Sequence, residues 1–452
     1  MKRYLSLALG LALSVTGWSQ AEKETKSSFS LKEAQDFAVE NSYFTRSARM
    51  DVTKSEQRVK EITGIGLPQV NGKVDYNYFI EIPTSVVPAN SFDPTAPADQ
   101  FVELEFGTKQ NMTAGVSVNQ IIFDGSYLVG LKASKTYREL AYASKDKTDV
   151  EIQRDVTKAY GFVLIAEENY KLVQENAKKL EQLVEENTAM YEAGFMEEKD
   201  LDQIKILLLQ NENILIQTDN QRKVALDMLK FAMGKPIAEP LELTDNLDDI
   251  KEPFLDKEAN LQSKFMMEKH VDFRRALVNL EASELTLSNE KVANYPTLYG
   301  FLNYDYQAFG SDFNFFSGGK WYPSSIVGLQ LKVPIFSGGQ RHMKIQQAKV
   351  GLEQANLQME QTEENLKLDV ANKRNSYEAA MNKLENASKN LDLARKIQDQ
   401  TRVKYSEGIS SSVELTQTEN QFLQSQMNYV GVVYEVIEAK ADLDYALGNY
   451  NK

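Results

Sequence analysis

The chain has 452 residues, and its 65 Asp and Glu against 51 Lys and Arg give a formal net charge of −14. This acidic balance disfavours nucleic-acid binding, and the absence of cysteine excludes disulfides, thiol catalysis and lipid attachment at a cysteine. With only His270 and His342 available for a zinc site, and no nucleotide-binding or hydrolase fingerprint, we expect no catalytic residue, no metal and no cofactor.

The N-terminus has the pattern of an export signal. Lys2 and Arg3 precede an apolar run from Leu5 to Val15, and Gly17 and Ser19 supply the small residues of a cleavage site. We predict a signal peptide at 1–19. An uncleaved anchor helix is the alternative, but the run is shorter than the roughly 18–20 residues a span needs. No later stretch is apolar enough for a membrane helix, so a chain that crosses a membrane must use strands.

The first half, residues 30–234, predicts a helix, two strands and two more helices. Pro68 ends the first helix because proline disfavours the helical conformation in the preceding residue. A long loop rich in Pro, Asp and Glu, from Glu81 to about Gly107, separates the strands. The predicted elements are a helix from Leu31 to about Ile62, strands at about 69–81 and 110–122, a long helix at about 126–192 and a helix at about 198–232.

Both strands show a period of two, with an apolar and a polar face. In the first strand, apolar and small residues (Val70, Gly72, Val74, Tyr76, Tyr78, Ile80) alternate with polar ones (Asn71, Lys73, Asp75, Asn77). The second strand alternates Met112, Ala114, Val116 and Val118 with Asn111, Thr113, Ser117 and Asn119. Runs of about ten residues have the length of a tilted membrane strand. A soluble antiparallel sheet facing a core is the alternative.

The second half repeats the first. Gln120 to Gly125 resembles Val333 to Gly338, and Tyr191 to Gly194 resembles Tyr405 to Gly408, at an offset of about 214 residues. Residues 262–448 therefore form a second copy. It is predicted to hold a helix, strands at about 297–307 and 325–335, a long helix at about 340–405 and a helix at about 411–447. Tyr76, Tyr78, Tyr304, Tyr306, Trp321 and Tyr322 would supply interfacial aromatic residues.

The long helices carry apolar seams of near-heptad spacing. The first seam is Val156, Tyr160, Val163, Tyr170, Val173, Leu180 and Leu183, and the second is Leu366, Val370, Tyr377, Met381, Leu384, Ala387, Leu391 and Ala394. About 65 helical residues span roughly 100 Å. This length indicates a tunnel wall, with a fibrous rod as the alternative. The segment 235–260, with Pro236, Pro240, Pro253 and an acidic run, predicts a linker between the copies.

Four strands are too few to close a membrane barrel, since the smallest bacterial ones have eight. An open edge in lipid would leave backbone groups unpaired, so several chains must pool their strands. A dimer would provide eight strands and a trimer twelve, and the pattern does not choose between them. The polar strand face would line a wet lumen: Asn71, Lys73, Asp75, Asn119, Gln330 and Lys332.

The double repeat, Pro68 and Pro296 before strands, the two corner motifs (122–125 and 335–339) and the two tip motifs (191–201 and 405–415) resemble the TolC-like outer-membrane efflux family. The resemblance covers nearly the whole mature chain. It implies a mixed α and β membrane protein: a homotrimer whose twelve-stranded barrel sits in outer-membrane lipid and continues as a periplasmic α-helical coiled-coil barrel. It also implies a periplasmic adaptor and an inner-membrane transporter as partners, and an equatorial position for 235–260.

The resemblance also implies residue roles at the helix tips. Tyr191, Gly194 and Gly408 belong to the hairpin tips that contact the adaptor. Asp200 matches an aspartate that hydrogen-bonds the tyrosine at Tyr405 and so helps to hold the entrance shut. Glu414 matches a ring of carboxylates around the lumen. The second acidic position is Gln417 here, and the gating arginine position is Ser410, so this sequence departs from the family's gate network.

We therefore expect an outer-membrane exit duct that conducts small molecules passively. One alternative is an exit duct of type I protein secretion, which the same fold serves. An alternative of another class is a periplasmic coiled-coil scaffold. Apolar, lipid-facing strand positions with aromatic ends favour the duct over the scaffold.

Overall fold

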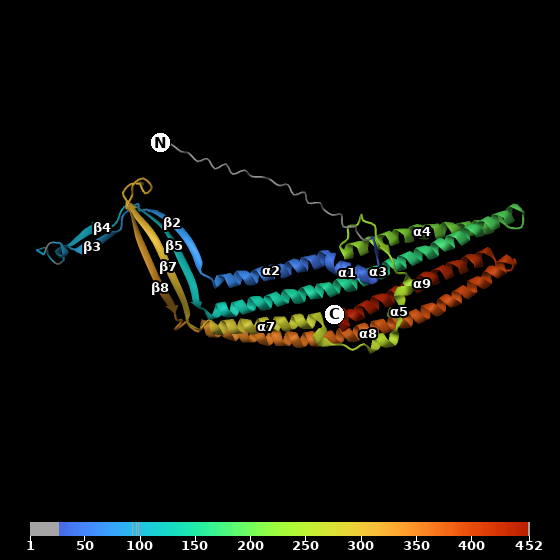
Figure 1. Ribbon diagram of the computed structural model, residues 1–452. Helices are drawn as coiled ribbons and strands as arrows, with labels where there is room; N and C mark the ends of the chain where they lie inside the picture. The colour runs from blue at the N-terminus through green and yellow to red at the C-terminus, as the bar shows by residue number, and fades with distance from the viewer. Residues whose placement is uncertain (1–26, 93, 96, 98, 451–452) are drawn as a thin grey trace, which may run out of the picture.

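A sheet lies at one end of the chain and long helices run away from it to the other end (Figure 1). The computed structural model describes residues 27–450 except 93, 96 and 98, so the predicted signal peptide lies outside the described residues. The two longest helices are α3, Gly125–Glu192, and α8, Gln340–Ser406. Each turns back at its far end into a second helix, α4 (Glu198–Met233) and α9 (Ser412–Leu447). The molecule thus consists mainly of one sheet and two long helical hairpins that extend away from it.

The first helical segment differs from the prediction. It consists of two helices, α1 (Leu31–Asn41) and α2 (Tyr43–Ile65), because Ser42 has an extended ψ of 141° that interrupts the helical path. Gly234, with φ of +74°, lies against this break, and a Cβ placed on it would be 2.3 Å from the Asn41 carbonyl oxygen. The chain therefore bends where the end of α4 needs room.

The sheet has four antiparallel strands in the order β2, β5, β7, β8. Strands β2 and β8 are its outer members, and within the described chain each pairs on one side only. The two strands of each copy are therefore neighbours, and the two copies meet at the centre of the sheet, where β5 pairs with β7. Their bounds are Gln69–Tyr78, Gln110–Phe123, Thr297–Gly310 and Trp321–Lys332.

The predicted bounds of the last strand and the predicted loop between the first two strands need correction. β8 begins and ends earlier than the predicted 325–335, since Pro334 has no N–H to donate to a ladder and Pro323 is tolerated in a strand at the sheet's edge. The predicted loop between the first two strands contains a small antiparallel pair, β3 (Thr84–Pro88) and β4 (Phe101–Glu105), joined through a short 3₁₀ turn, Ala89–Ser91. Its Val86, Val87, Phe101 and Val102 have high strand propensity despite the surrounding prolines.

The segment between the copies is short but structured. It contains β6 (Glu242–Leu243), which pairs in parallel with β1 (Ser28–Phe29), followed by α5 (Leu247–Leu255) and α6 (Lys257–Gln262). A 3₁₀ turn, Met267–Lys269, leads into α7, Val271–Val292. Two tyrosines of the long helices hold the segment in place.

These tyrosines anchor the segment by hydrogen bonds. The Tyr160 hydroxyl lies 3.0 Å from a carboxylate oxygen of Asp245, and the Tyr377 hydroxyl donates to the Phe254 carbonyl at 2.7 Å. Burial and the negative charge of Asp245 raise the pKa of Tyr160. The Tyr160 hydroxyl therefore stays protonated at physiological pH and can donate a hydrogen bond.

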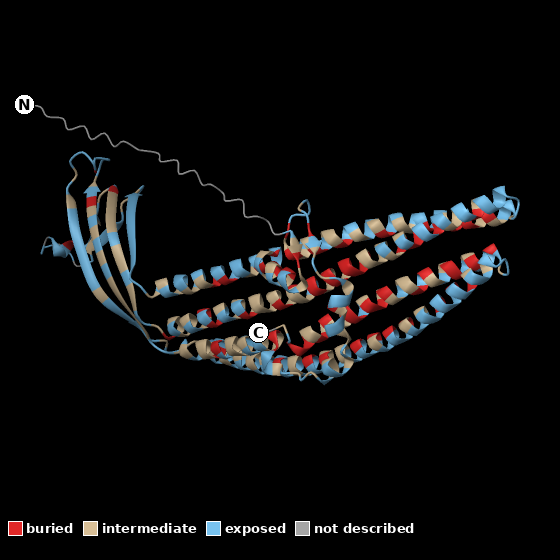
Figure 2. Cartoon of the chain, turned by 45° about the vertical axis from the view of Figure 1, so that its right-hand side comes forward, coloured by how far each residue is buried: buried red, intermediate tan, exposed pale blue. Residues whose placement is uncertain are grey.

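The core lies halfway along the helices, where red residues gather in Figure 2, while the sheet is mostly exposed on both faces. Much of each predicted seam is buried: Val156, Tyr160, Val163, Val173 and Leu180 in α3, and Leu366, Val370, Tyr377, Leu384, Ala387 and Ala394 in α8. Among the described residues, no helix combines the length and apolar character of a membrane span.

Candidate functional site at the hairpin tips

Both hairpins turn at a glycine with a left-handed backbone. Gly194 has φ of +76° and Gly408 has φ of +72°. The N–H of Phe195 donates to the Met190 carbonyl and that of Ile409 to the Lys404 carbonyl, which satisfies carbonyls left free at the helix ends. Both long helices therefore end at a glycine whose positive φ other residues rarely adopt.

The tips lie at the end of the molecule farthest from the sheet (Figure 1), and they expose apolar side chains. Phe195 is 85% exposed, Ile409 75% and Val413 54%. Tyr191, predicted to contact a partner, is 39% exposed and lies just before the first turn. Such exposed apolar side chains at the end of a hairpin are typical of a docking surface rather than of a core.

Beside the turns, hydrogen bonds of Tyr405 and Ser412 join the first hairpin to the second. The Tyr405 hydroxyl of α8 donates to Asn187 Oδ1 of α3 at 2.6 Å, and the Ser412 hydroxyl of α9 is 2.6 Å from Asp200 Oδ1 of α4. Asn187 and Ser412 are each only 2% exposed. These contacts, which we call the tip clasp, link all four helices beside the turns.

The predicted hydrogen bond between Asp200 and Tyr405 is wrong for the described chain. Tyr405 finds its acceptor on α3, in Asn187, while the carboxylate of Asp200 is taken by Ser412, whose hydroxyl also lies 2.6 Å from the Gln203 amide oxygen. Burial, and secondly the charge of Asp200, raise the pKa of Tyr405. The phenol therefore stays a donor, and the two predicted residues act in neighbouring contacts.

The other predicted gate residues lie at the start of α9. Glu414 is exposed, its N–H donates to the Ser411 hydroxyl at 3.2 Å, and its carboxylate accepts a 2.7 Å hydrogen bond from the Ser410 hydroxyl. A carboxylate in the first turn of a helix is favoured by the helix dipole. Gln417 is exposed one turn later. Ser410 thus braces Glu414.

Sequence reasoning missed a buried ionic group next to the second tip. Glu419 of α9 is 1% exposed and is bound by both Nε and Nη2 of Arg402 and, at 2.7 Å, by the amide of Gln398. Glu419 lies four residues after Leu415 and four before Leu423, so the helical spacing of these leucines predicts an apolar residue at position 419. That break in the pattern was the available signal. The fork of Arg402 ties α8 to α9.

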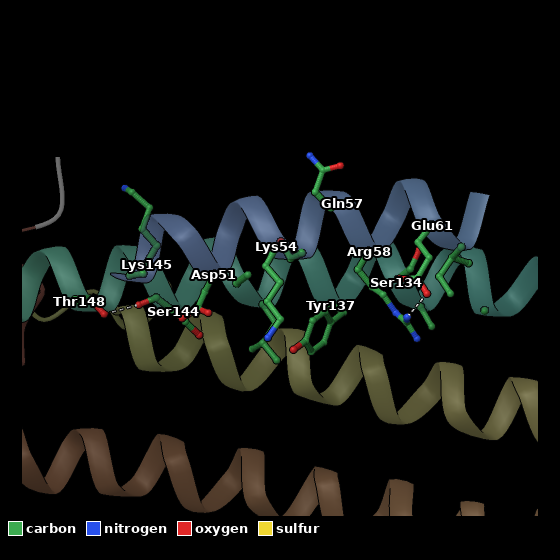
Figure 3. A pocket seen from close by; sticks show the side chains of 17 residues that line it. Asp51, Lys54, Gln57, Arg58, Glu61, Ser134, Tyr137, Ser144, Lys145 and Thr148 are labelled. Carbon is green, nitrogen blue, oxygen red and sulfur yellow. Dashed lines mark hydrogen bonds and ion pairs between the residues drawn. The ribbon is translucent and has the colours of Figure 1, made fainter. Parts of the chain in front are cut away.

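A concave region lies between α2 and α3, far from the tips, and has a volume of about 1220 Å³. Figure 3 shows Lys54 and Tyr137 pointing into this groove and Gln57 pointing away from it. Arg58 and Glu61 form an ion pair on its rim. Its charges are mixed, and within the described ranges no three His, Cys, Asp or Glu side chains come together as a metal site. The groove is lined by both charged and apolar side chains.

Comparison with known proteins gives a family. The profile of the family described as Outer membrane efflux protein matches residues 45–235 and 266–449, which together exceed half of the chain and correspond to its two halves. No curated protein matches the sequence significantly. The fold resembles several solved outer-membrane channels.

Three of these structures illustrate the likeness. CusC, described as forming a transmembrane channel, has a TM-score of 0.70 at 15% identity, over 92% of this chain and 91% of its own. The outer membrane protein VceC of Vibrio cholerae has 0.67 at 17%, over 92% and 96%. The CmeC outer membrane channel of Campylobacter jejuni has 0.67 at 15%, over 100% and 94%. At these identities the likeness concerns the fold.

Proposed function

The chain belongs to the outer membrane efflux protein family, whose members are outer-membrane channels and not enzymes, and on this basis we propose that it is the exit duct of a tripartite efflux system. The protein lies in the outer membrane and extends into the periplasm. In the proposed system it conducts small molecules passively, while an inner-membrane transporter supplies the energy and a periplasmic adaptor joins the two.

The observation that carries the proposal is the open four-stranded sheet on top of two long helical hairpins. One sheet face is apolar and the other polar, and β2 and β8 have free edges within the described chain. In lipid each unpaired backbone group costs several kcal/mol, about what is gained when β8 of one copy pairs with β2 of the next. Three copies give the twelve strands that the family resemblance implies.

The helices then extend the lumen inward. Exposed polar residues cover much of α8, whose buried positions are confined to one seam. In a ring of hairpins these polar faces line a wet tunnel whose far end is formed by the tips. Glu414 from each copy would stand near the axis, where three carboxylates repel one another and attract cations.

The tips serve two roles in the proposal. The exposed Phe195, Ile409 and Val413 dock the adaptor, with Gly194 and Gly408 fixing the shape of the turns. The tip clasp keeps the two hairpins of each copy together and holds the entrance narrow. Docking that separates the hairpins must break Tyr405–Asn187 and Ser412–Asp200.

Membrane fractionation followed by planar-bilayer recording tests this function. We expect the protein in the outer-membrane fraction and discrete conductance steps after reconstitution. Recovery in the soluble periplasmic fraction alone would contradict the duct and favour a scaffold. Deletion of the gene should raise cellular sensitivity to small toxic compounds; loss of an exported polypeptide with unchanged sensitivity would favour protein secretion instead.

A further inference from the structure

The charged residues of the four-stranded sheet all lie on one face. Strand alternation and the observed register place Lys73, Asp75, Asp305 and Lys332 together with Asn71, Ser117 and Asn303. The opposite face carries none and includes Val74, Val116, Leu302, Val327 and Leu329. A face with charges and a face without them are what a wall between water and lipid requires.

One row across this sheet has an unusual composition. Lys73 of β2 is opposite Gly115 of β5, Gly115 is opposite Asp305 of β7, and Asp305 is opposite Ser324 of β8. Lys73 and Asp305 are thus two strands apart, about 9.5 Å between backbones. Nevertheless the Lys73 ammonium lies 3.7 Å from Asp305 Oδ1. The two side chains meet over the middle strand.

Gly115 makes this meeting possible. A Cβ at residue 115 would lie 1.8 Å from Asp305 Oδ1, so the carboxylate occupies the volume of the missing side chain. The Asp305 side chain is consequently 19% exposed although it stands on an open sheet, while that of Lys73 is 50% exposed. Any other residue at 115 would force the carboxylate off this seat. The glycine therefore sets where the charge lies.

The charges near this row do not cancel. Asp75 lies two residues from Lys73 on the same face, so two carboxylates accompany one ammonium. Lys332 stands at the other end of β8, about 26 Å from Ser324 along the strand. That distance exceeds twice the screening length of about 8–10 Å at physiological ionic strength, so Lys332 does not neutralise the row. Each copy thus contributes net negative charge at mid-sheet.

We propose that Lys73, Gly115, Asp75 and Asp305 form a charge filter within the barrel that favours cationic over anionic solutes. The inference rests on the proposed function, because the polar face must line a conducting lumen. Repeated in each copy, the row makes a ring of fixed charges that every solute passes. Seating of Asp305 over Gly115 keeps the carboxylate beside the wall, which leaves the lumen wide while retaining the charge.

Cysteine reactivity tests the filter locally, without interference from the tips. The native chain has no cysteine, so Ser324→Cys places a single thiol opposite Asp305. In reconstituted vesicles we would compare the rates of modification by a cationic and an anionic methanethiosulfonate reagent. We expect Asp305→Asn, which neutralises a charge about 5–7 Å away, to lower the ratio of cationic to anionic rates by about three- to tenfold. Lys73→Gln should raise the ratio by a smaller factor, because Lys73 stands on β2 and its ammonium lies beyond the Asp305 carboxylate.

Two controls separate the possible failures. Glu103→Gln removes a carboxylate from β4, outside the sheet, and should leave the ratio unchanged. Val327→Cys lies on the apolar face and should react with neither reagent. If Ser324→Cys is also unreactive, the lumen itself is misplaced and the proposed function fails. If it reacts but the ratio is the same in Asp305→Asn and Lys73→Gln as in the parent, the filter is overturned.

Gly115→Ala completes the test without changing any charge. The added Cβ displaces Asp305 from its seat and separates it from Lys73. In the Gly115→Ala background the displaced carboxylate no longer holds the Lys73 ammonium over the middle strand. We therefore expect the Lys73→Gln substitution to change the rate ratio less in that background than in the parent. Equal effects in both backgrounds would refute the role assigned to Gly115.

Discussion

Removing the tip clasp should open the entrance. Tyr405→Phe together with Ser412→Ala deletes both hydrogen bonds of the tip clasp. Each bond contributes about 0.5–1 kcal/mol to the stability of the closed entrance. With about 1–2 kcal/mol per copy and three copies opening together, the closed-to-open ratio should fall by about two to four powers of ten.

The assay is single-channel recording in planar bilayers. We expect a higher open probability or conductance in the double variant, with a smaller effect from either substitution alone. Tyr191→Phe is the matched control, since this tyrosine lies beside the first turn and is exposed. If the double variant and the parent gave the same conductance, the clasp would not be the closure, although the fold would stand.

Three further predictions concern stability. Arg402→Ala removes the ionic partner of the buried Glu419 carboxylate, which keeps only the Gln398 amide, and should destabilise the second tip by about 2–3 kcal/mol, more than Glu419→Gln does; hydrogen exchange of the α8 and α9 amides would measure this, and equal exchange would contradict it. Gly408→Ala should cost about 1 kcal/mol for its positive φ alone, whereas Gly234→Ala should cost over about 3 kcal/mol because its Cβ meets backbone atoms, as urea unfolding would show. Burial lowers the pKa of His270, so its contribution to stability is present above about pH 6.5 and is lost as the pH falls below it; thermal unfolding at pH 7.5 and 5.5 should show a larger loss in the parent than in His270→Gln.

The regular elements were predictable because their periodicities are strong. Alternation over about ten residues placed β2 and β5, the repeat placed the strands of the second copy, and the seams of α3 and α8 marked the buried helix faces. Local breaks were not predictable in the same way. The helix is interrupted at Ser42, where it lies against Gly234, a residue far away in the sequence. The strand pair β3–β4 lies within a segment whose prolines indicate a loop.

The candidate site was predictable in position but not in its bonds. The glycines located both turns, and Tyr405 and Asp200 do lie beside them. Which side chain each of them bonds depends on how closely the four helices pack, and the sequence alone does not determine that packing. Asn187 and Ser412 belong to elements that no local pattern connects to these residues. Glu419 was visible only as a charged residue in an apolar seam.

The central claim is that several copies pool their strands into one conducting barrel. Native mass spectrometry of the protein extracted from the outer membrane in mild detergent measures this directly. We predict a particle of three chains that stays intact after the detergent micelle has been stripped away. A particle of one chain, with the edges of β2 and β8 left unpaired, would contradict the claim.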